Sequence, residues 1–354
     1  MGELRYLPNT IPASASTSED REMTRELWLN EVFPEWKSML NIEIENTQVD
    51  KNTFALWFLG GPSWAYKSPE GITCLIDNYS GSSQNSEEHY CGVCRTSGAP
   101  YLTWLRVNPH VIDPWKFSRL DLVFATHHHQ DHADIYTVKG TLNSTKCKYV
   151  GPKNTVKKFR EWGVPDDRII EVKPGDTFVV KDVSVTIEKN YDSMAAMTGD
   201  FKPDDPIDYD SNAVSFILSS AGKSVIFLGD SLYHNGYAAV GHRNKIDVAI
   251  GDMGYNPPGI TDKMSPYDLY RVAEALRTDV LIPDHYENWG SSVLDPQQLV
   301  EIIKMNRSKI RPVLMRSGGK FVYPNDREMD IYTYPDNSDR YDWKKSWVYG
   351  ENSR

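Results

Sequence analysis

Short apolar runs that stop at glycine or polar residues recur along most of the chain. Runs of this length are typical of buried strands, and they cover residues 53–59, 72–77, 120–125, 148–151, 213–218, 224–228, 247–252 and 280–283. Apolar and polar residues alternate from Arg168 to Lys189. Turn sequences at 174–176 and 181–182 interrupt that stretch, so it is predicted to form a meander.

Helical patterns follow several of these strands. The expected helices cover 21–44, with Pro34 as an interruption, and then 133–142, 154–162, 265–276 and 295–305. Asn154 and Ser265 stand where an N-cap side chain is expected, and Gly163 stands where a helix stops. Because each half of the chain has strands followed by covering helices, the sequence predicts an α/β (α+β) fold, a four-layer αββα sandwich. Residues 1–20 are polar, and we expect a flexible lead-in there, followed by a single domain over 21–354.

The composition is that of a globular protein and narrows the possible partners. The 354 residues are 40% apolar and 25% charged, and the net charge of −10 argues against nucleic-acid binding, which requires a basic patch. A small anionic substrate remains compatible with this charge, because a metal ion creates a local positive field. No apolar run approaches the roughly 18 residues of a membrane span, and the N-terminal stretch lacks the apolar core of a signal peptide. We therefore expect a cytoplasmic protein that binds neither membrane nor nucleic acid.

Four cysteines in a chain of this length do not indicate a disulfide framework. Cys91 and Cys94 form a C-x-x-C sequence preceded by His89. The three interpretations of this sequence are a redox pair, half of a zinc site and an inert loop. The sequence has no second C-x-x-C, and this favours the inert loop. The surrounding segment 78–115 is long and polar without a clear period, so we expect it to border the substrate site or a subunit contact.

The sequence feature that most clearly indicates a functional site is a histidine cluster directly after the apolar run 120–125. Four of the nine histidines lie within six residues, in a pattern H-x-H-x-D-H that offers His127, His129, Asp131 and His132 as ligands. Imidazole and carboxylate groups suit zinc, iron, nickel or manganese. In extended backbone His127 and His129 point the same way, while Asp131 and His132 turn toward a second point, which suits two adjacent ions. A surface histidine cluster or a pH-sensing patch is the alternative, and the position after a buried strand favours the metal site.

Two residues later in the chain also leave the ends of apolar strands. Asp230 follows Gly229 and is either a turn aspartate or a carboxylate that bridges two cations, while His285 is either a core histidine or a further ligand. The metal interpretation of both is favoured once H-x-H-x-D-H is accepted, because a two-metal site needs more ligands than that motif supplies. Asp77 ends the strand over 72–77, where a turn-forming role is favoured over support for the metals.

The order of H-x-H-x-D-H, a Gly-Asp pair at a strand end and a late strand-end histidine resembles the metallo-β-lactamase superfamily. Within it, further stretches spanning residues 33 to 321 resemble the bacterial L-ascorbate-6-phosphate lactonases. They are Phe33-Pro34-Glu35-Trp36, Gly151-Pro152-Lys153, Trp162-Gly163-Val164-Pro165, Val172-Lys173-Pro174-Gly175-Asp176, Gly229-Asp230-Ser231, Gly259-Ile260-Thr261-Asp262-Lys263-Met264 and Gly318-Gly319-Lys320-Phe321. The metal motif is specific to the superfamily, and only the combination of the other stretches indicates the lactonases.

This resemblance implies a four-layer αββα metallo-β-lactamase sandwich and a divalent metal, commonly manganese, with zinc or iron as alternatives. It also implies hydrolysis of L-ascorbate 6-phosphate to 3-keto-L-gulonate 6-phosphate, in the cytoplasm, by a homo-oligomer that is hexameric in the family. Most members of the superfamily place a further histidine ligand before the bridging aspartate, but no histidine lies between His132 and Asp230. Asp192 is our candidate substitute, with an ordinary loop aspartate as the alternative. A carboxylate there favours a harder ion such as manganese and predicts a weak first metal site.

The expected mechanism uses the metals to activate water. A bound divalent ion lowers the pKa of water from about 15.7 toward about 7, so hydroxide is available near Asp230 to attack the lactone carbonyl. Asp131 and Asp230 are the predicted catalytic residues: the hydroxide is held near Asp230, and Asp131 can orient it or share its proton as well as bind metal. Further candidates have less support: His234, Tyr286 and Glu287 as the acid for the leaving oxygen, and Lys263 and Arg316 as phosphate ligands or as surface charges.

Two alternative functions share the same ligand set. Two-metal sites also serve phosphoryl transfer, so a phosphodiesterase on the same fold is the first alternative. A metal-binding regulatory protein without turnover is the second, and the missing histidine is its main support. The acidic balance disfavours nucleic acid as a phosphodiester substrate, but not a small phosphodiester.

Overall fold

The computed structural model describes residues 40–81, 106–200, 202, 204–256, 261–290 and 292–329. The predicted lead-in at 1–20, most of the predicted helix at 21–44 and the Cys91/Cys94 pair lie outside these ranges. The division into a lead-in and a single domain over 21–354 therefore stays a prediction.

The first sheet of the described structure begins and ends with segments far apart in the sequence. Its strand order is β14-β1-β2-β3-β4-β5-β6, with β14 (Lys320–Tyr323), β1 (Phe54–Gly60), β2 (Ser63–Lys67), β3 (Thr73–Ile76), β4 (Leu122–Phe124), β5 (Lys148–Gly151) and β6 (Ile169–Glu171). The strands from β3 to β6 are parallel, so their carboxyl ends lie at one edge of the sheet.

The second sheet has the order β13-β12-β11-β10-β9-β8-β7. Its strands are β7 (Thr177–Val180), β8 (Val183–Lys189), β9 (Val214–Ser220), β10 (Lys223–Phe227), β11 (Val248–Asp252), β12 (Val280–Asp284) and β13 (Arg311–Pro312). The strands from β10 to β13 are parallel, like the second half of the first sheet.

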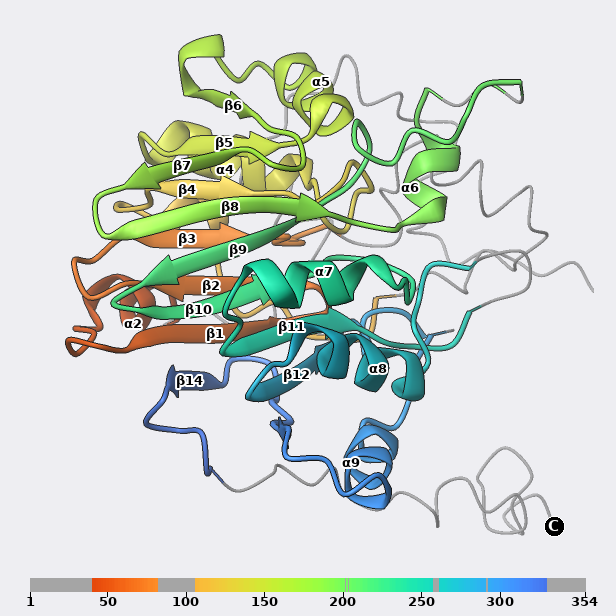
Figure 1. The fold of residues 1–354 in the computed structure, drawn as a ribbon. Coiled ribbons are helices and arrows are strands. Elements are labelled where there is room, and N and C mark those ends of the chain that lie inside the picture. Colours follow the sequence, from red (N-terminus) through yellow and green to blue (C-terminus); the bar gives the residue numbers. More distant parts are fainter. Residues whose placement is uncertain are drawn as a thin grey trace, which may run out of the picture.

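Three separate apolar clusters show that the fold has four layers. One cluster fills the space between the sheets and includes Leu56 and Phe58. Their neighbours Trp57 and Leu59 face the other way, where the first sheet packs against α2 (Leu40–Asn46), α4 (Ile135–Ser144) and α5 (Lys153–Glu161). The third cluster lies between the second sheet and α7 (Gly236–Arg243), α8 (Pro266–Leu276) and α9 (Gln297–Met305), and Figure 1 shows α7 and α8 lying over this sheet. Burial on both faces explains why the strands are apolar throughout.

The predicted αββα sandwich is confirmed, but two local predictions need correction. The stretch from Arg168 to Lys189 is not one meander, because β6 joins the first sheet while β7 and β8 form the edge of the second. The turn that contains Gly175 (φ 95°) carries the chain between the sheets. Asn154 does not cap α5, because the helix begins at Lys153 with Pro152 as its N-cap; the buried Asn154 amide donates to Asn212 Oδ1 at 2.6 Å. Strands β2, β13 and β14 were not predicted.

Other helix signals are confirmed. Ser265 caps α8 by accepting a hydrogen bond from the Asp268 amide, and Pro266 occupies the first turn. Gly163 (φ 85°) follows the end of α5. Within the described ranges, no helix is both long and apolar enough to cross a membrane.

The two sheets are joined by backbone at the edge where the parallel strands end. His127, just after β4, forms a bridge with Ala213, just before β9. The amide of Val214 donates to the carbonyl of Thr126 at 3.0 Å. The histidine motif is therefore held between the sheets and not on one of them.

Candidate metal centre

The structure brings together all seven residues that the sequence predicts as metal ligands. Each is almost fully buried: His127, His129, Asp131, His132, Asp192, Asp230 and His285. Their ligand atoms form three overlapping sets, each with atoms within 4.8 Å of one another. Two of these sets share no residue, and we refer to them as the first group (His127, His129 and Asp192) and the second group (Asp131, His132 and His285).

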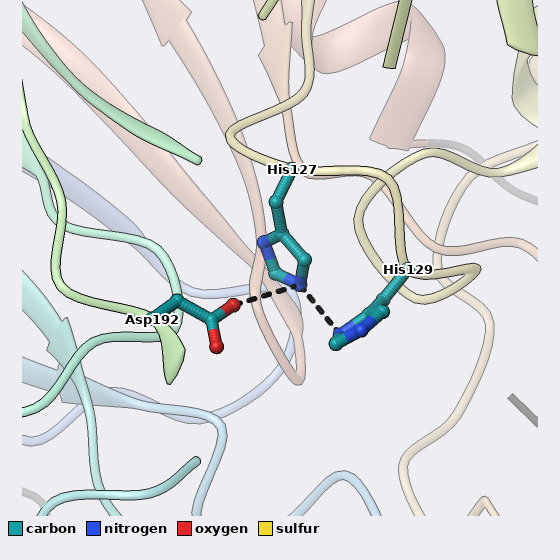
Figure 2. Close-up of side chains that lie close together, drawn as sticks. All are labelled: His127, His129 and Asp192. Atoms are coloured by element: carbon teal, nitrogen blue, oxygen red, sulfur yellow. Dashed lines mark hydrogen bonds and ion pairs between the residues drawn. The ribbon is translucent and has the colours of Figure 1, made fainter. Parts of the chain in front are cut away.

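In the first group the ligand atoms surround His127. Its Nε2 atom lies 3.0 Å from His129 Nδ1 and 3.6 Å from Asp192 Oδ2, as Figure 2 shows. Asp192 is the N-cap of the short helix α6 (Ser193–Thr198), and its other oxygen accepts from the Ala195 amide at 2.9 Å. The cap fixes the carboxylate so that Oδ2 faces the histidines.

A threonine hydroxyl determines which nitrogen His129 presents. Thr198 Oγ1 donates to the Met194 carbonyl at 2.8 Å, so toward His129 Nε2, 2.7 Å away, it acts as acceptor. His129 Nε2 therefore carries the proton, and Nδ1 has its lone pair directed at the first group. Thr198 was not predicted, because a threonine late in a short helix carries no sequence signal for this role.

In the second group Asp131 is held by two hydrogen bonds and faces a histidine. Its Oδ2 atom lies 3.1 Å from Asn288 Nδ2, 3.2 Å from Trp289 Nε1 and 3.1 Å from His285 Nε2. Its other oxygen, Oδ1, has no hydrogen-bond partner. His285 follows β12 with a left-handed backbone (φ 64°), and its amide donates to the Gly61 carbonyl at 3.0 Å. This hydrogen bond stabilises a conformation that is unfavourable for histidine.

Asp77 orients His132 from the end of β3. One carboxylate oxygen, Oδ2, lies 3.0 Å from His132 Nδ1 and accepts from Thr126 Oγ1 at 2.7 Å, while Oδ1 accepts from the Thr126 amide at 2.7 Å. An aspartate bonded to Nδ1–H leaves His132 Nε2 free to bind metal. Asp77 does adopt a turn conformation (φ 47°), but the interpretation as a turn former alone is wrong.

Asp230 lies between the two groups. Its Oδ1 atom is 3.3 Å from His132 Nε2 and 3.4 Å from His285 Nε2, and Oδ2 contacts the ammonium group of Lys263. The preceding Gly229 has φ 65°, and a Cβ atom there would lie 2.5 Å from Thr126 Oγ1. Only glycine allows the Asp230 strand end to approach the histidine motif this closely.

The buried atoms that face one another in this cluster fit a divalent cation. Four of them have no hydrogen-bond partner: His132 Nε2, Asp192 Oδ2, Asp230 Oδ1 and His285 Nε2. Buried polar atoms are nearly always bonded, so four unbonded ones in one place require an explanation. Lone pairs of imidazole and carboxylate groups that converge in this way are a metal site.

Comparison with known proteins agrees with this geometry. Residues 99–286 match the family model of the beta-lactamase superfamily domain. The protein from Escherichia fergusonii named "Probable L-ascorbate-6-phosphate lactonase UlaG" is 36% identical over 334 residues, which cover 90% of this chain and 94% of that protein. The chain belongs to the metallo-β-lactamase superfamily. The protein of the same name from Escherichia coli O157:H7 is equally similar, with 36% identity over 90% of this chain.

Solved structures of this superfamily fold are similar over most of the chain. An isothiocyanate hydrolase from Delia radicum gut bacteria superposes with a TM-score of 0.58 at 16% identity, covering 75% of this chain and 98% of its own. Igni18, a metallo hydrolase from Ignicoccus hospitalis, gives 0.54 at 17% identity, covering 77% and 98%. These likenesses concern the fold alone. The family and the curated relatives together show that the chain is a metal-dependent hydrolase.

The electrostatics of the first group differ between its histidine and its carboxyl group. Burial lowers the pKa of His127 well below its usual value, and the neighbouring His132 and His129 lower it further, so the imidazole is neutral and able to bind metal. Burial raises the pKa of Asp192 well above its usual range, and the charge of Asp230 adds to this effect, so the carboxyl group favours its protonated form. A divalent ion would stabilise the ionised Asp192 by supplying positive charge.

The structure separates the remaining candidates. Lys263 is 4% exposed, so its interpretation as a surface charge is wrong, whereas Arg316 is exposed. The hydroxyl of Tyr286 donates to the Met315 carbonyl at 3.0 Å, and Glu287 Oε1 accepts from Ser317 Oγ at 2.9 Å. His234 is exposed and stacks on Tyr191, the residue before Asp192, with ring centroids 3.9 Å apart.

Proposed function

We propose that this chain is a metal-dependent lactonase that hydrolyses L-ascorbate 6-phosphate to 3-keto-L-gulonate 6-phosphate. The observation that supports this most directly is the 36% identity, over 90% of the chain, to relatives named as L-ascorbate-6-phosphate lactonases. The buried cluster supports the hydrolytic part independently, because it converges imidazole and carboxylate lone pairs at strand ends. The proposal includes a cytoplasmic homo-oligomer, hexameric as the resemblance implies, with a single hydrolase domain over 21–354.

The proposed metal ligands are His127, His129, Asp131, His132, Asp192, Asp230 and His285. Three of the seven are carboxylates, and carboxylate oxygens favour harder ions, so we propose manganese ahead of zinc or iron. Asp192 would take the place of the histidine that the sequence lacks, and its position 3.6 Å from His127 Nε2 supports that role.

A divalent ion bound here would supply activated water at neutral pH and would polarise the lactone carbonyl. Asp131 and Asp230 are the proposed catalytic residues. Each has one oxygen, Oδ2, held by neighbours and another, Oδ1, without a hydrogen-bond partner. These free oxygens can orient the attacking water and hold its proton.

His234 is the proposed acid for the leaving oxygen. Its Nδ1 atom accepts from the Gly236 amide at 2.9 Å, which leaves the exposed Nε2 to carry and donate the proton. Stacking on Tyr191, the residue before Asp192 in the chain, fixes the orientation of the ring. Tyr286 and Glu287 are less suitable, because both are already bonded to the segment around Met315 and Ser317.

Side-by-side assays test the substrate. L-Ascorbate 6-phosphate, free ascorbate and a simple phosphodiester are compared with manganese-loaded protein and with protein shown to be metal-free by elemental analysis. We expect kcat/KM for the phosphorylated lactone to exceed that for free ascorbate by about a hundredfold or more, because a remote phosphate contributes binding energy to the transition state.

Chelated protein should be inactive, and manganese should restore turnover. A preference for the phosphodiester would replace the lactonase with the phosphodiesterase alternative. Full turnover without metal would refute the mechanism. The regulatory alternative without turnover is disfavoured, since the relatives are hydrolases.

A further inference from the structure

A lysine ammonium group is buried against the carboxylate that lies between the two ligand groups. Lys263 Nζ contacts Asp230 Oδ2 and lies 3.4 Å from Asp262 Oδ2, and the lysine side chain is 3% exposed. A buried ammonium is stable only when carboxylates compensate its lost hydration. Lys263 is therefore a built-in cation at the edge of the cluster.

The backbone around Lys263 is held by hydrogen bonds on both sides. The Asn256 side chain accepts from the amides of Asp262 and Lys263 at 3.1 and 3.0 Å and donates to the Lys263 carbonyl at 2.9 Å. The next amide, that of Met264, donates to Asp252 Oδ2 at 3.2 Å. The ammonium group is therefore presented from a fixed backbone, and its contacts with Asp230 and Asp262 hold it at the cluster.

This contact leaves Asp230 with a single oxygen for metal. Oδ2 is occupied by the lysine, whereas Oδ1 has no hydrogen-bond partner and lies 3.3 Å from His132 Nε2 and 3.4 Å from His285 Nε2. A carboxylate with two free oxygens can give one to each of two ions. Here Oδ1 serves the second group first, because it is close to His132 and His285, which both belong to that group.

We propose that Lys263 is a positioning residue that makes the two metal groups unequal. It reserves Asp230 Oδ2, so the first ion binds at the second group with Asp230 Oδ1 as a fourth ligand. The next ion is left with His127, His129 and Asp192, and the fixed ammonium charge repels it. We expect its affinity to be at least about tenfold lower. The inference rests on the proposed function only in taking this cluster as the metal site.

Titration of the metal-free wild-type protein tests the inference without an activity assay. Binding of Mn²⁺ is followed by calorimetry and by the electron paramagnetic resonance signal of the free ion. We expect one tight site and one site at least about tenfold weaker. Two ions of equal affinity would overturn the inference and leave the proposed function intact, whereas no binding at all would overturn both.

The variant Lys263→Met tests whether the lysine causes the difference. Loss of the ammonium frees Asp230 Oδ2 and removes the repulsion, so the two affinities should approach each other by about tenfold. The control is Lys245→Met, which removes another lysine paired with a buried aspartate, Asp247, at 3.0 Å. This pair lies at the start of β11, away from the cluster, so the control should keep the wild-type gap.

An unchanged gap in Lys263→Met, with wild-type circular dichroism, would overturn the inference. If this variant does not fold, the wild-type titration still decides whether the two sites are unequal. Lys263→Gln then provides a neutral side chain that can still donate to Asp230. It separates the charge of Lys263 from its hydrogen bond.

Discussion

The two ligand groups share one cluster, but different elements of the fold hold their ligands in place. The first group comes from the loop after β4 and from the N-cap of a six-residue helix, α6. The second group combines the same loop with the end of β12, and its histidine His132 is oriented by Asp77 at the end of β3. Both groups therefore need the two sheets to be correctly paired, because Asp192 follows β8 of the second sheet, but the second group has an additional support at the end of β3.

The partners that orient the ligands differ in the same way. His127 and His129 are bonded to the hydroxyls of Thr126 and Thr198, while His132 is bonded to the carboxylate of Asp77. Hydrogen bonds to a charged partner are roughly twice as strong as those between neutral groups. The comparison teaches that the second group is the rigid half of the cluster and the first group is the adjustable half.

The largest expected effect separates the groups directly. His285→Asn removes an imidazole of the second group, and asparagine tolerates the left-handed backbone at this position. We expect loss of the tightly bound ion and a fall in kcat/KM of about a thousandfold, corresponding to several kcal/mol of metal catalysis.

The matched variant His129→Asn, in the first group, should retain one ion per chain and lose less activity. Elemental analysis and steady-state kinetics measure both variants. Equal losses in the two would contradict the distinction between a rigid and an adjustable half.

A smaller effect is expected from Asp77→Asn, which weakens the support of His132 without removing a ligand. An amide cannot stabilise the Nδ1–H bond as a carboxylate does, so affinity for the tight ion should fall by about 10–100-fold. Asp247→Asn is the control, because Asp247 is also buried and accepts from a backbone amide, that of Ser224 at 2.8 Å, away from the cluster. Calorimetry with Mn²⁺ compares them. Unchanged affinity in Asp77→Asn would mean that packing alone orients His132.

The smallest expected effect concerns Thr198→Val. The variant keeps the side-chain shape but removes the acceptor for His129 Nε2–H, so about 1 kcal/mol, or roughly fivefold in affinity, should be lost at the weaker site only. The tight site serves as the internal control in the same calorimetric titration. A change at the tight site instead would show that the two groups are coupled more closely than their separate partners indicate.

Much of the site could be predicted because its ligands follow strong strand signals. The motif from His127 to His132 comes directly after an apolar run, and His285 ends another. Asp192 could be predicted only because a histidine was missing where the superfamily has one. Its cap of α6 and its distance of 3.6 Å from His127 Nε2 now support that choice.

The residues that support the ligands could not be predicted from local sequence. An aspartate at a strand end, such as Asp77, looks the same whether it forms a turn or orients a histidine 55 positions later. Lys263 looks like an exposed charge until the second sheet places it against Asp230. The sequence did contain one indication of buried negative charge at this edge of the sheet. An aspartate stands at the end of three successive strands, namely Asp230, Asp252 and Asp284. Burial raises the pKa of Asp284 to about 7.

The contact between Thr126 and Gly229 limits which residue positions can be substituted if this enzyme is redesigned to accept another ester. A side chain at position 229 meets two separate obstacles, a left-handed backbone and a hydroxyl 2.5 Å away, so relieving one does not relieve the other. Libraries should therefore leave the Gly229–Asp230 pair and Thr126 untouched. Diversity belongs at exposed positions outside the proposed catalytic set, such as Arg316, where a new side chain does not move the two sheets apart.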